Sequence, residues 1–168
     1  TETASEKQRK ELMNKPVKNK KIFQISGWMN KYNIDFGSSV FFGMPGDSFD
    51  DHIRRIKFFR KVNPEYLWTT FFQPYPGLSL TNSLEVQQHM PKEQEFEVTL
   101  HHNMYLNLPD RDRLVNLKKV YFLCMKFPFL EKLLIKLTFI RFPLLFDFLF
   151  MTHFTYYIFK FEQVSFIQ

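Results

Sequence analysis

Two short loops carry the residues of this chain that are best suited to hold a ligand. The first is Gly43–Ser48, with the sequence GMPGDS, and the second is Gln73–Gly77, with the sequence QPYPG. Glycine lets a backbone approach a ligand closely. Each loop follows a segment typical of a β-strand, and parallel α/β folds place ligands beyond the carboxyl ends of their strands. The sequence therefore predicts a ligand-binding edge at these loops.

Commoner catalytic and metal-binding patterns are missing from the sequence. It contains no Ser-His-Asp arrangement and no glycine-lysine phosphate motif. The single cysteine, Cys124, excludes an internal disulfide and any zinc or iron–sulfur site built from several cysteines of this chain. Cys124 falls on the apolar face of a predicted helix, which favours a buried thiol over a nucleophile. We interpret His101-His102 as surface residues rather than metal ligands, while His52 and His89 stand alone.

One βαβ unit would position the two loops. Residues 35–42 end in a β-branched and aromatic run that predicts a strand, which the glycines and proline of the first loop stop. In the helix that follows, Ser48 can be the N-cap and Asp51 adds negative charge to the first turn. Asn63-Pro64 ends that helix, and residues 65–72 predict a second strand. Such a unit makes its strands parallel, with a right-handed crossover.

Helices are expected on both sides of this unit. Thr3 followed by Glu6 fits a capping box, so a helix is predicted from about Ala4 to Asn14. A second helix is predicted from Lys18 to Tyr32, with Asn33 as a left-handed cap. Beyond the second loop, we expect residues 78–90 to be irregular and the acidic residues 91–107 to be partly helical. Proline and apolar spacing then predict three helices, at residues 110–126, 129–140 and 143–160.

Composition indicates a folded chain with a basic surface. The 168 residues are 45% hydrophobic, include 22 Phe, and carry a net charge of +6. The charge is explained by a solvated lysine-rich surface, or by an anionic ligand, nucleic acid or membrane surface. Nucleic-acid binding through Lys15–Lys21 rests on charge alone and is not expected. The polar N-terminus has no signal-peptide character, and the first residue is not methionine, so we expect a cytoplasmic piece of a longer chain.

The last part of the chain is rich in phenylalanine. Residues 133–159 are mostly apolar, but charged residues and a proline interrupt them, so no membrane-spanning helix is expected. We expect these helices to pack on the sheet or on a partner region. Docking at a membrane surface is the alternative, because basic and aromatic residues are mixed there.

Four segments carry a family resemblance. Residues 2–15 resemble the pattern E-[ST]-G-S…R…L-N-[RK], and residues 34–48 resemble a strand and loop that end in the pattern hydrophobic-G-L-P-G-E-[ST], here residues 42–48. Residues 64–77 resemble K-P-D-Y…F-Q-P-Y-P-G-T, and residues 116–128 resemble a helical N-L…L-F…K-F-P tail. In this order they resemble the C-terminal half of radical S-adenosylmethionine (SAM) enzymes, most closely the group with an N-terminal cobalamin-binding domain. Ala4, Asp47 and Leu78 depart from the usual Gly, Glu and Thr.

The resemblance implies a fold and a division of the chain. The fold class is α/β: the C-terminal half of a partial (β/α)6 radical SAM barrel with parallel strands, followed by an α-helical C-terminal extension. Residues 1–80 would form the half barrel, residues 81–112 an irregular connector, and residues 113–168 the helical, Phe-rich region.

The resemblance also implies cofactors. An intact enzyme of this family binds a four-iron, four-sulfur (4Fe-4S) cluster through a Cys-x-x-x-Cys-x-x-Cys loop and cleaves SAM reductively. The outcome would be radical methylation or rearrangement, with cobalamin as a further cofactor. This chain lacks the cysteine loop, so we expect it alone to bind none of these groups tightly and to be inactive. Its implied partner is the missing N-terminal half of the barrel, in the same gene or in a separate chain.

By the same resemblance, eight residues would bind SAM and none would be catalytic. Glu2 and Ser5 would lie near the ribose or the amino-acid group, or would only cap the first helix. The first loop would pass under the adenosyl group, or be a plain turn, and the second would line the adenine pocket, or be a structural turn. The residues assigned in the loops are Gly43, Pro45, Gly46, Gln73, Tyr75 and Gly77. The alternative function is a truncated, non-catalytic module that binds a partner or a membrane surface through its Phe-rich helices.

Overall fold

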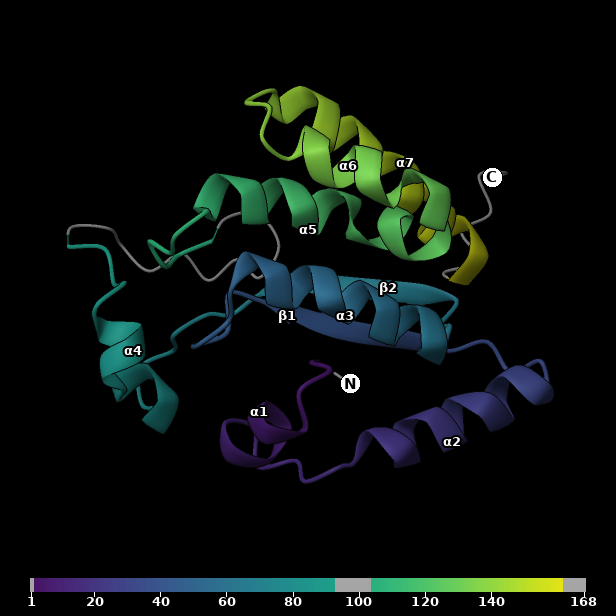
Figure 1. The fold of residues 1–168 in the computed structure, drawn as a ribbon, viewed down its shortest axis with the longest axis horizontal. Helices are drawn as coiled ribbons and strands as arrows, with labels where there is room; N and C mark the ends of the chain where they lie inside the picture. Colours follow the sequence, from purple (N-terminus) through teal and green to yellow (C-terminus); the bar gives the residue numbers. More distant parts are fainter. Residues whose placement is uncertain (1, 93–103, 162–168) are drawn as a thin grey trace, which may run out of the picture.

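The structure, a computed structural model, describes residues 2–92 and 104–161 as helices, two strands and connecting loops (Figure 1). The elements run in this order: α1 Glu6–Glu11, α2 Asn19–Lys31, β1 Gly37–Phe42, α3 Phe49–Val62, β2 Tyr66–Phe71, the 3-10 turn η1 Ser79–Asn82, α4 Leu84–Gln87, α5 Arg111–Lys126, the 3-10 turn η2 Pro128–Leu130, α6 Glu131–Leu137 and α7 Pro143–Phe161.

The two strands pair in parallel, as the βαβ pattern predicts. Gly37 lies opposite Tyr66 and Phe42 opposite Phe71, with α3 as the connection between the strands. Within the described residues this is a two-stranded sheet. The α/β class is therefore confirmed in coarse form, as a mixed fold with mostly helices. The described part of the chain does not display the strands of a barrel.

The free edge of β1 meets the start of the chain. The amide of Phe41 donates a hydrogen bond of 2.9 Å to the carbonyl of Glu2, while Phe72 donates one of 2.8 Å to the carbonyl of Phe42. Successive residues of a strand direct their backbone groups to opposite edges, so Glu2 and β2 lie on opposite sides of β1. The N-terminal segment thus occupies the position of a further strand end beside β1.

The helix α3 begins and ends where the sequence predicts. The Ser48 hydroxyl accepts a hydrogen bond of 3.2 Å from the Asp51 amide, and the Asp51 carboxylate accepts one of 2.9 Å from the Ser48 amide. This reciprocal pair is a complete capping box. The sequence predicts only a favourable charge from Asp51, so its hydrogen bond to the Ser48 amide is an additional contact. Asn63 ends the helix with a φ of +52°, and Asn33 after α2 has a φ of +53°.

The capping prediction for α1 is wrong. Ser5, not Thr3, is the N-cap, because its hydroxyl accepts a hydrogen bond from the Gln8 amide. The Thr3 hydroxyl instead donates to the Gln8 side chain at 2.7 Å. The helix is also shorter than predicted, since the buried Arg9 guanidinium binds the carbonyls of Thr3 and Val17 and holds the following segment across it.

The helices form layers on either side of the sheet region (Figure 1). On one side α5 packs against α3 and β2, and α6 and α7 lie outside α5. On the other side lie α1 and α2. The main hydrophobic core joins the strands and α3 to α5, α6 and α7, and Cys124 is buried within it. Cys124 therefore takes the buried position that its helical phase predicts.

Several C-terminal predictions hold with changes in detail. The helix predicted at 129–140 is η2 followed by the shorter α6, because the Asn116 amide binds the carbonyls of Thr138 and Ile140 and turns the chain there. Residues 78–90, expected to be irregular, contain η1 and α4. Among the described residues, no helix has both the length and the apolar character needed to cross a membrane.

Candidate functional site

Both predicted loops lie at the same end of the sheet. Gly43–Ser48 follows β1 and Gln73–Gly77 follows β2, and the strands are parallel and in register. Gly43, Gly46 and Gly77 have φ values of +72°, +76° and +89°, which residues with a side chain rarely adopt. The sequence prediction that these loops share one edge is confirmed.

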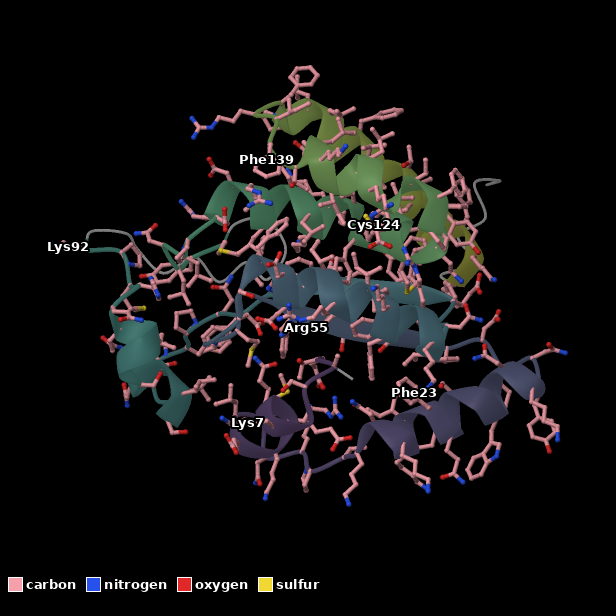
Figure 2. All side chains as sticks on the ribbon, viewed as in Figure 1. Lys7, Phe23, Arg55, Lys92, Cys124 and Phe139 are labelled. Carbon is pink, nitrogen blue, oxygen red and sulfur yellow. The ribbon has the colours of Figure 1, made fainter. Side chains whose placement is uncertain are left out.

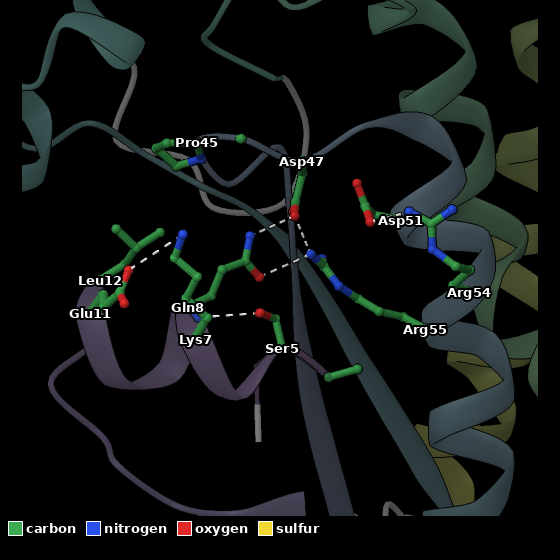
Figure 3. Close-up of a pocket in the computed structure, with 12 residues that line it drawn as sticks. Ser5, Lys7, Gln8, Glu11, Leu12, Pro45, Asp47, Asp51, Arg54 and Arg55 are labelled. Carbon is green, nitrogen blue, oxygen red and sulfur yellow. Dashed lines mark hydrogen bonds and ion pairs between the residues drawn. The ribbon is translucent and has the colours of Figure 1, made fainter.

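A cleft of about 510 Å³ opens beside the first loop, between α1 and the start of α3 (Figure 3). This volume is in the range of small-molecule sites. Its walls hold exposed side chains of both charges and backbone from the loop. They consist of Ala4, Ser5, Lys7, Gln8, Glu11, Leu12, Pro45, Gly46, Asp47, Asp51, Arg54 and Arg55. Such a mixed wall suits a ligand that carries both a cationic and an anionic group.

A buried ion pair forms the inner wall of the cleft. Arg55 on α3 pairs with the Asp47 carboxylate, and their side chains are only 4% and 2% exposed. Gln8 on α1 donates a hydrogen bond of 2.7 Å to the same carboxylate oxygen and accepts one of 3.2 Å from Arg55. Arg55 also donates to the carbonyl of Phe41 at 3.2 Å. This cluster joins α1, the first loop, α3 and β1 at one point.

His52 on α3 lies beside both members of the ion pair. Its ring stacks on Phe42 with 4.5 Å between centroids, and its backbone carbonyl accepts a hydrogen bond of 2.8 Å from the Tyr121 hydroxyl. Burial, and secondly the nearby Arg55 guanidinium, hold the pKa of His52 well below its usual 6.5. His52 is therefore neutral at pH 7. The prediction that His52 stands alone is wrong.

Both ring nitrogens of His52 face hydrogen-bond donors. A guanidinium nitrogen of Arg55 lies 3.4 Å from Nδ1, and the amide nitrogen of Gly43 lies 3.5 Å from Nε2. Nε2 also lies 3.6 Å from the second oxygen of Asp47. That oxygen is buried without a hydrogen bond among the described residues. Burial raises the pKa of Asp47 above its usual 3.8, although Arg55 and Gln8 oppose this effect.

Of the site residues predicted near the N-terminus and in the first loop, only some line the cleft. Ser5, Pro45 and Gly46 lie in its wall. Glu2 does not, because its carboxylate forms an ion pair of 2.5 Å with Lys15. Burial is the largest single effect on Glu2 and raises its pKa. The hydrogen bond and charge of Lys15, together with smaller contacts, lower the pKa by more, so the pKa of Glu2 is lowered overall. Ser5 caps α1, the plainer of the two roles predicted for it.

The remaining predicted residues lie outside this cleft. A side chain at Gly43 would meet Leu108 at 3.0 Å and Met104 at 3.3 Å, so protein atoms cover this glycine. In the second loop, Gln73 is buried and its carbonyl accepts a hydrogen bond of 2.9 Å from the Tyr75 amide. Open space surrounds the position of a side chain at Gly77. The cleft is therefore lined by the first loop and not by the second. The second loop lies next to the first loop at the same end of the sheet.

Sequence reasoning missed Gln8, Asp47 and Arg55 as members of one site. The signal for Arg55 and His52 was their place in α3, beside the apolar residues Ile56 and Phe59 that face the sheet. A charged residue in that phase must find a partner when it is buried. Asp47, the partner of Arg55, is only eight residues away, but Gln8 is 39 residues from Asp47, so local sequence could not indicate Gln8.

The chain's own residues do not fit an iron–sulfur cluster. Its one cysteine is buried, and burial raises the pKa of the Cys124 thiol to about 12, whereas a cluster needs thiolates. Within residues 2–92 and 104–161, no three His, Cys, Asp or Glu side chains come together to hold a metal ion. His101 and His102 lie outside the described residues.

Comparison with known proteins gives no assignment. No protein-family model matches the chain, and no curated protein matches it.

Proposed function

We propose that this chain supplies the SAM-positioning half of a radical SAM barrel. The observation that carries the proposal is the parallel pairing of β1 and β2, with both glycine-bearing loops at one end of the sheet. Glu2 beside the opposite edge of β1 adds a third neighbour in chain order. A parallel barrel needs this side-by-side sequence of strand ends.

The cleft supports a binding role for the first loop. SAM carries an ammonium, a carboxylate and a sulfonium, and the cleft offers the exposed charges of Lys7, Glu11 and Arg54 with the backbone of Pro45 and Gly46. In an intact enzyme, the cluster and SAM would supply the radical chemistry for methylation or rearrangement, with cobalamin as a further cofactor. This chain would orient SAM, and the missing N-terminal half would hold the cluster.

The test is a two-dimensional amide NMR titration of the whole chain with S-adenosylhomocysteine, a stable SAM analogue, up to millimolar concentration. We expect shifts of the Gly43–Ser48 and Gln73–Gly77 amides. They should weaken in Tyr75→Ala and persist in Tyr32→Ala, a matched change at the exposed residue that caps the C-terminus of α2. Absence of shifts at both loops, or shifts confined to other parts of the chain, would reject the proposal. An in-frame Cys-x-x-x-Cys-x-x-Cys upstream in the coding region would support it independently.

A second candidate function is a docking module that acts through the C-terminal helices. The observation that favours it is the exposure of large apolar residues along α6 and α7. If these residues form a docking face, the double variant Leu144→Ser/Phe148→Ser should bind markedly less of a fluorescent apolar dye with unchanged circular dichroism. Equal dye binding by the variant and the wild type would reject a docking face there.

A further inference from the structure

The outward sides of α6 and α7 carry two apolar stripes. In the α6 region the stripe is Phe129, Leu133 and Ile140, and Phe129 is 79% exposed. On α7 the stripe is Leu144, Phe148, Met151 and Phe159, of which Leu144 is 70% and Phe148 66% exposed. On α7 the spacings of four, three and eight residues keep the stripe on one helical face, while Phe129 and Ile140 flank α6 in η2 and in the turn after the helix. Figure 2 shows side chains projecting outward from this layer.

These stripes are not needed to hold the helices in place. The inward sides of α6 and α7 already pack through the buried Leu134, Phe146 and His153. The Nε2 of His153 donates a hydrogen bond of 3.0 Å to the carbonyl of Lys119 on α5. A helix that is apolar on all sides is normally covered on all sides. The outer stripes therefore form an apolar surface that suits a further contact.

The charges around the stripes are cationic. Lys132 and Lys136 are exposed on α6, and no carboxylate in the described part of the chain lies within ion-pair distance of either. The nearby acids are already neutralised, since Glu131 pairs with Arg60 at 2.5 Å and Asp147 pairs with Lys119 at 2.5 Å. The surface thus offers unpaired positive charge beside exposed aromatic and aliphatic side chains.

We propose that the outer stripes of α6 and α7 dock on the surface of an anionic lipid bilayer. Apolar side chains would enter the boundary between headgroups and acyl chains, and Lys132 and Lys136 would contact anionic headgroups. A second copy of the chain fits less well, because a twofold interface would bring these lysines together without acids to pair them. The inference rests on the docking-module function and is independent of SAM positioning.

The test is co-sedimentation of the whole chain with phosphatidylcholine vesicles and with vesicles that also contain roughly a third phosphatidylserine. We expect binding to the anionic vesicles that falls with added salt. The double variant Lys132→Gln/Lys136→Gln should bind them about 30-fold more weakly, since each surface lysine contributes about a factor of five. Phe148→Ser should weaken binding on the order of tenfold.

Matched variants and sedimentation velocity separate the outcomes. Lys20→Gln/Lys57→Gln alters exposed residues of α2 and α3, and Tyr32→Ser alters the exposed residue after α2; both variants should bind as the wild type does. Equal binding to neutral and anionic vesicles, or no effect of the α6 lysines, would overturn the proposal. A dimer that dissociates in Phe148→Ser would also overturn it, while keeping the docking face. A monomer that binds no vesicle, with dye binding unchanged by Leu144→Ser/Phe148→Ser, would overturn both.

Discussion

Replacing Asp47 by asparagine should destabilise the protein by about 3–5 kcal/mol. The structure sets this magnitude because the Asp47 and Arg55 side chains are 2% and 4% exposed, so the arginine charge would stay buried without its partner. The Gln8 amide would also lose a charged acceptor at 2.7 Å. The free energy of unfolding should be measured by urea denaturation at pH 7, followed by circular dichroism.

A double-mutant cycle isolates the ion pair from the change in shape. Arg55→Met alone should also be costly, since it leaves the Asp47 carboxylate buried and unpaired. The double variant Asp47→Asn/Arg55→Met should be more stable than the sum of the single losses by at least about 2 kcal/mol. Lys7→Met is the control, because the exposed Lys7–Glu11 pair, 3.9 Å apart, should contribute less than about 1 kcal/mol.

Two results would refute this reasoning. Asp47→Asn could cost no more than the Lys7→Met control, which would mean that the carboxyl is already neutral or that water reaches the pair. The two single losses could instead add without coupling, which would mean that Asp47 and Arg55 act separately. The first result would be compatible with the cleft, but it would show that the Asp47–Arg55 ion pair does not stabilise the inner wall.

Three further predictions use nearby residues. The pKa of His52 in the folded chain lies below 6.5, so its stabilising effect is complete above pH 6.5 and is lost as the pH falls toward the folded pKa. Between pH 7.5 and 5.5 this loss should reach about 1.4 kcal/mol in urea titrations, and His52→Gln should reduce the slope; an unchanged slope would contradict it. Gly43→Ala should destabilise by about 1–3 kcal/mol, because φ is +72° and Leu108 is 3.0 Å from the new methyl, whereas Gly27→Ala in open space on α2 should stabilise by up to about 1 kcal/mol. Equal thermal midpoints for the two variants would oppose this assignment. The Cys124 thiol, with its pKa raised to about 12, should react with a disulfide reagent only on unfolding, and rapid labelling of the native chain would exclude its burial.

The parts of the fold that sequence predicts are those with local causes. Ser48 and Asp51 lie within one turn and cap the same helix, and Asn63 before a proline ends it. The parallel pairing follows because a single helix separates two strand-like segments. The cleft has a different origin. It depends on Gln8 meeting Asp47 and Arg55, and a contact across 39 or 47 residues leaves no mark in local spacing.

The α1 error shows why competing caps are hard to rank. Thr3 and Ser5 are both good N-cap residues, and both fit the capping-box pattern, since Thr3 is followed three residues later by Glu6 and Ser5 by Gln8. The buried Arg9 decides between them, because it binds the carbonyl of Thr3 from inside the turn. That contact requires Thr3 to remain outside the helix, so Ser5 becomes the first available cap.

The position of Gly43 bears on how the two loops can share a ligand. Its missing side chain makes room for Leu108 and Met104, which approach to 3.0 Å and 3.3 Å of where a methyl would lie. The segment with residues 104–108 therefore covers the end of β1, and the open volume lies beyond it at Pro45 and Gly46. A ligand that touches both loops must pass beside Met104 or displace it. Met104→Ala should consequently strengthen the NMR response of the Gly43 amide to S-adenosylhomocysteine, while a weaker response would place the shared pocket on the other side of the sheet.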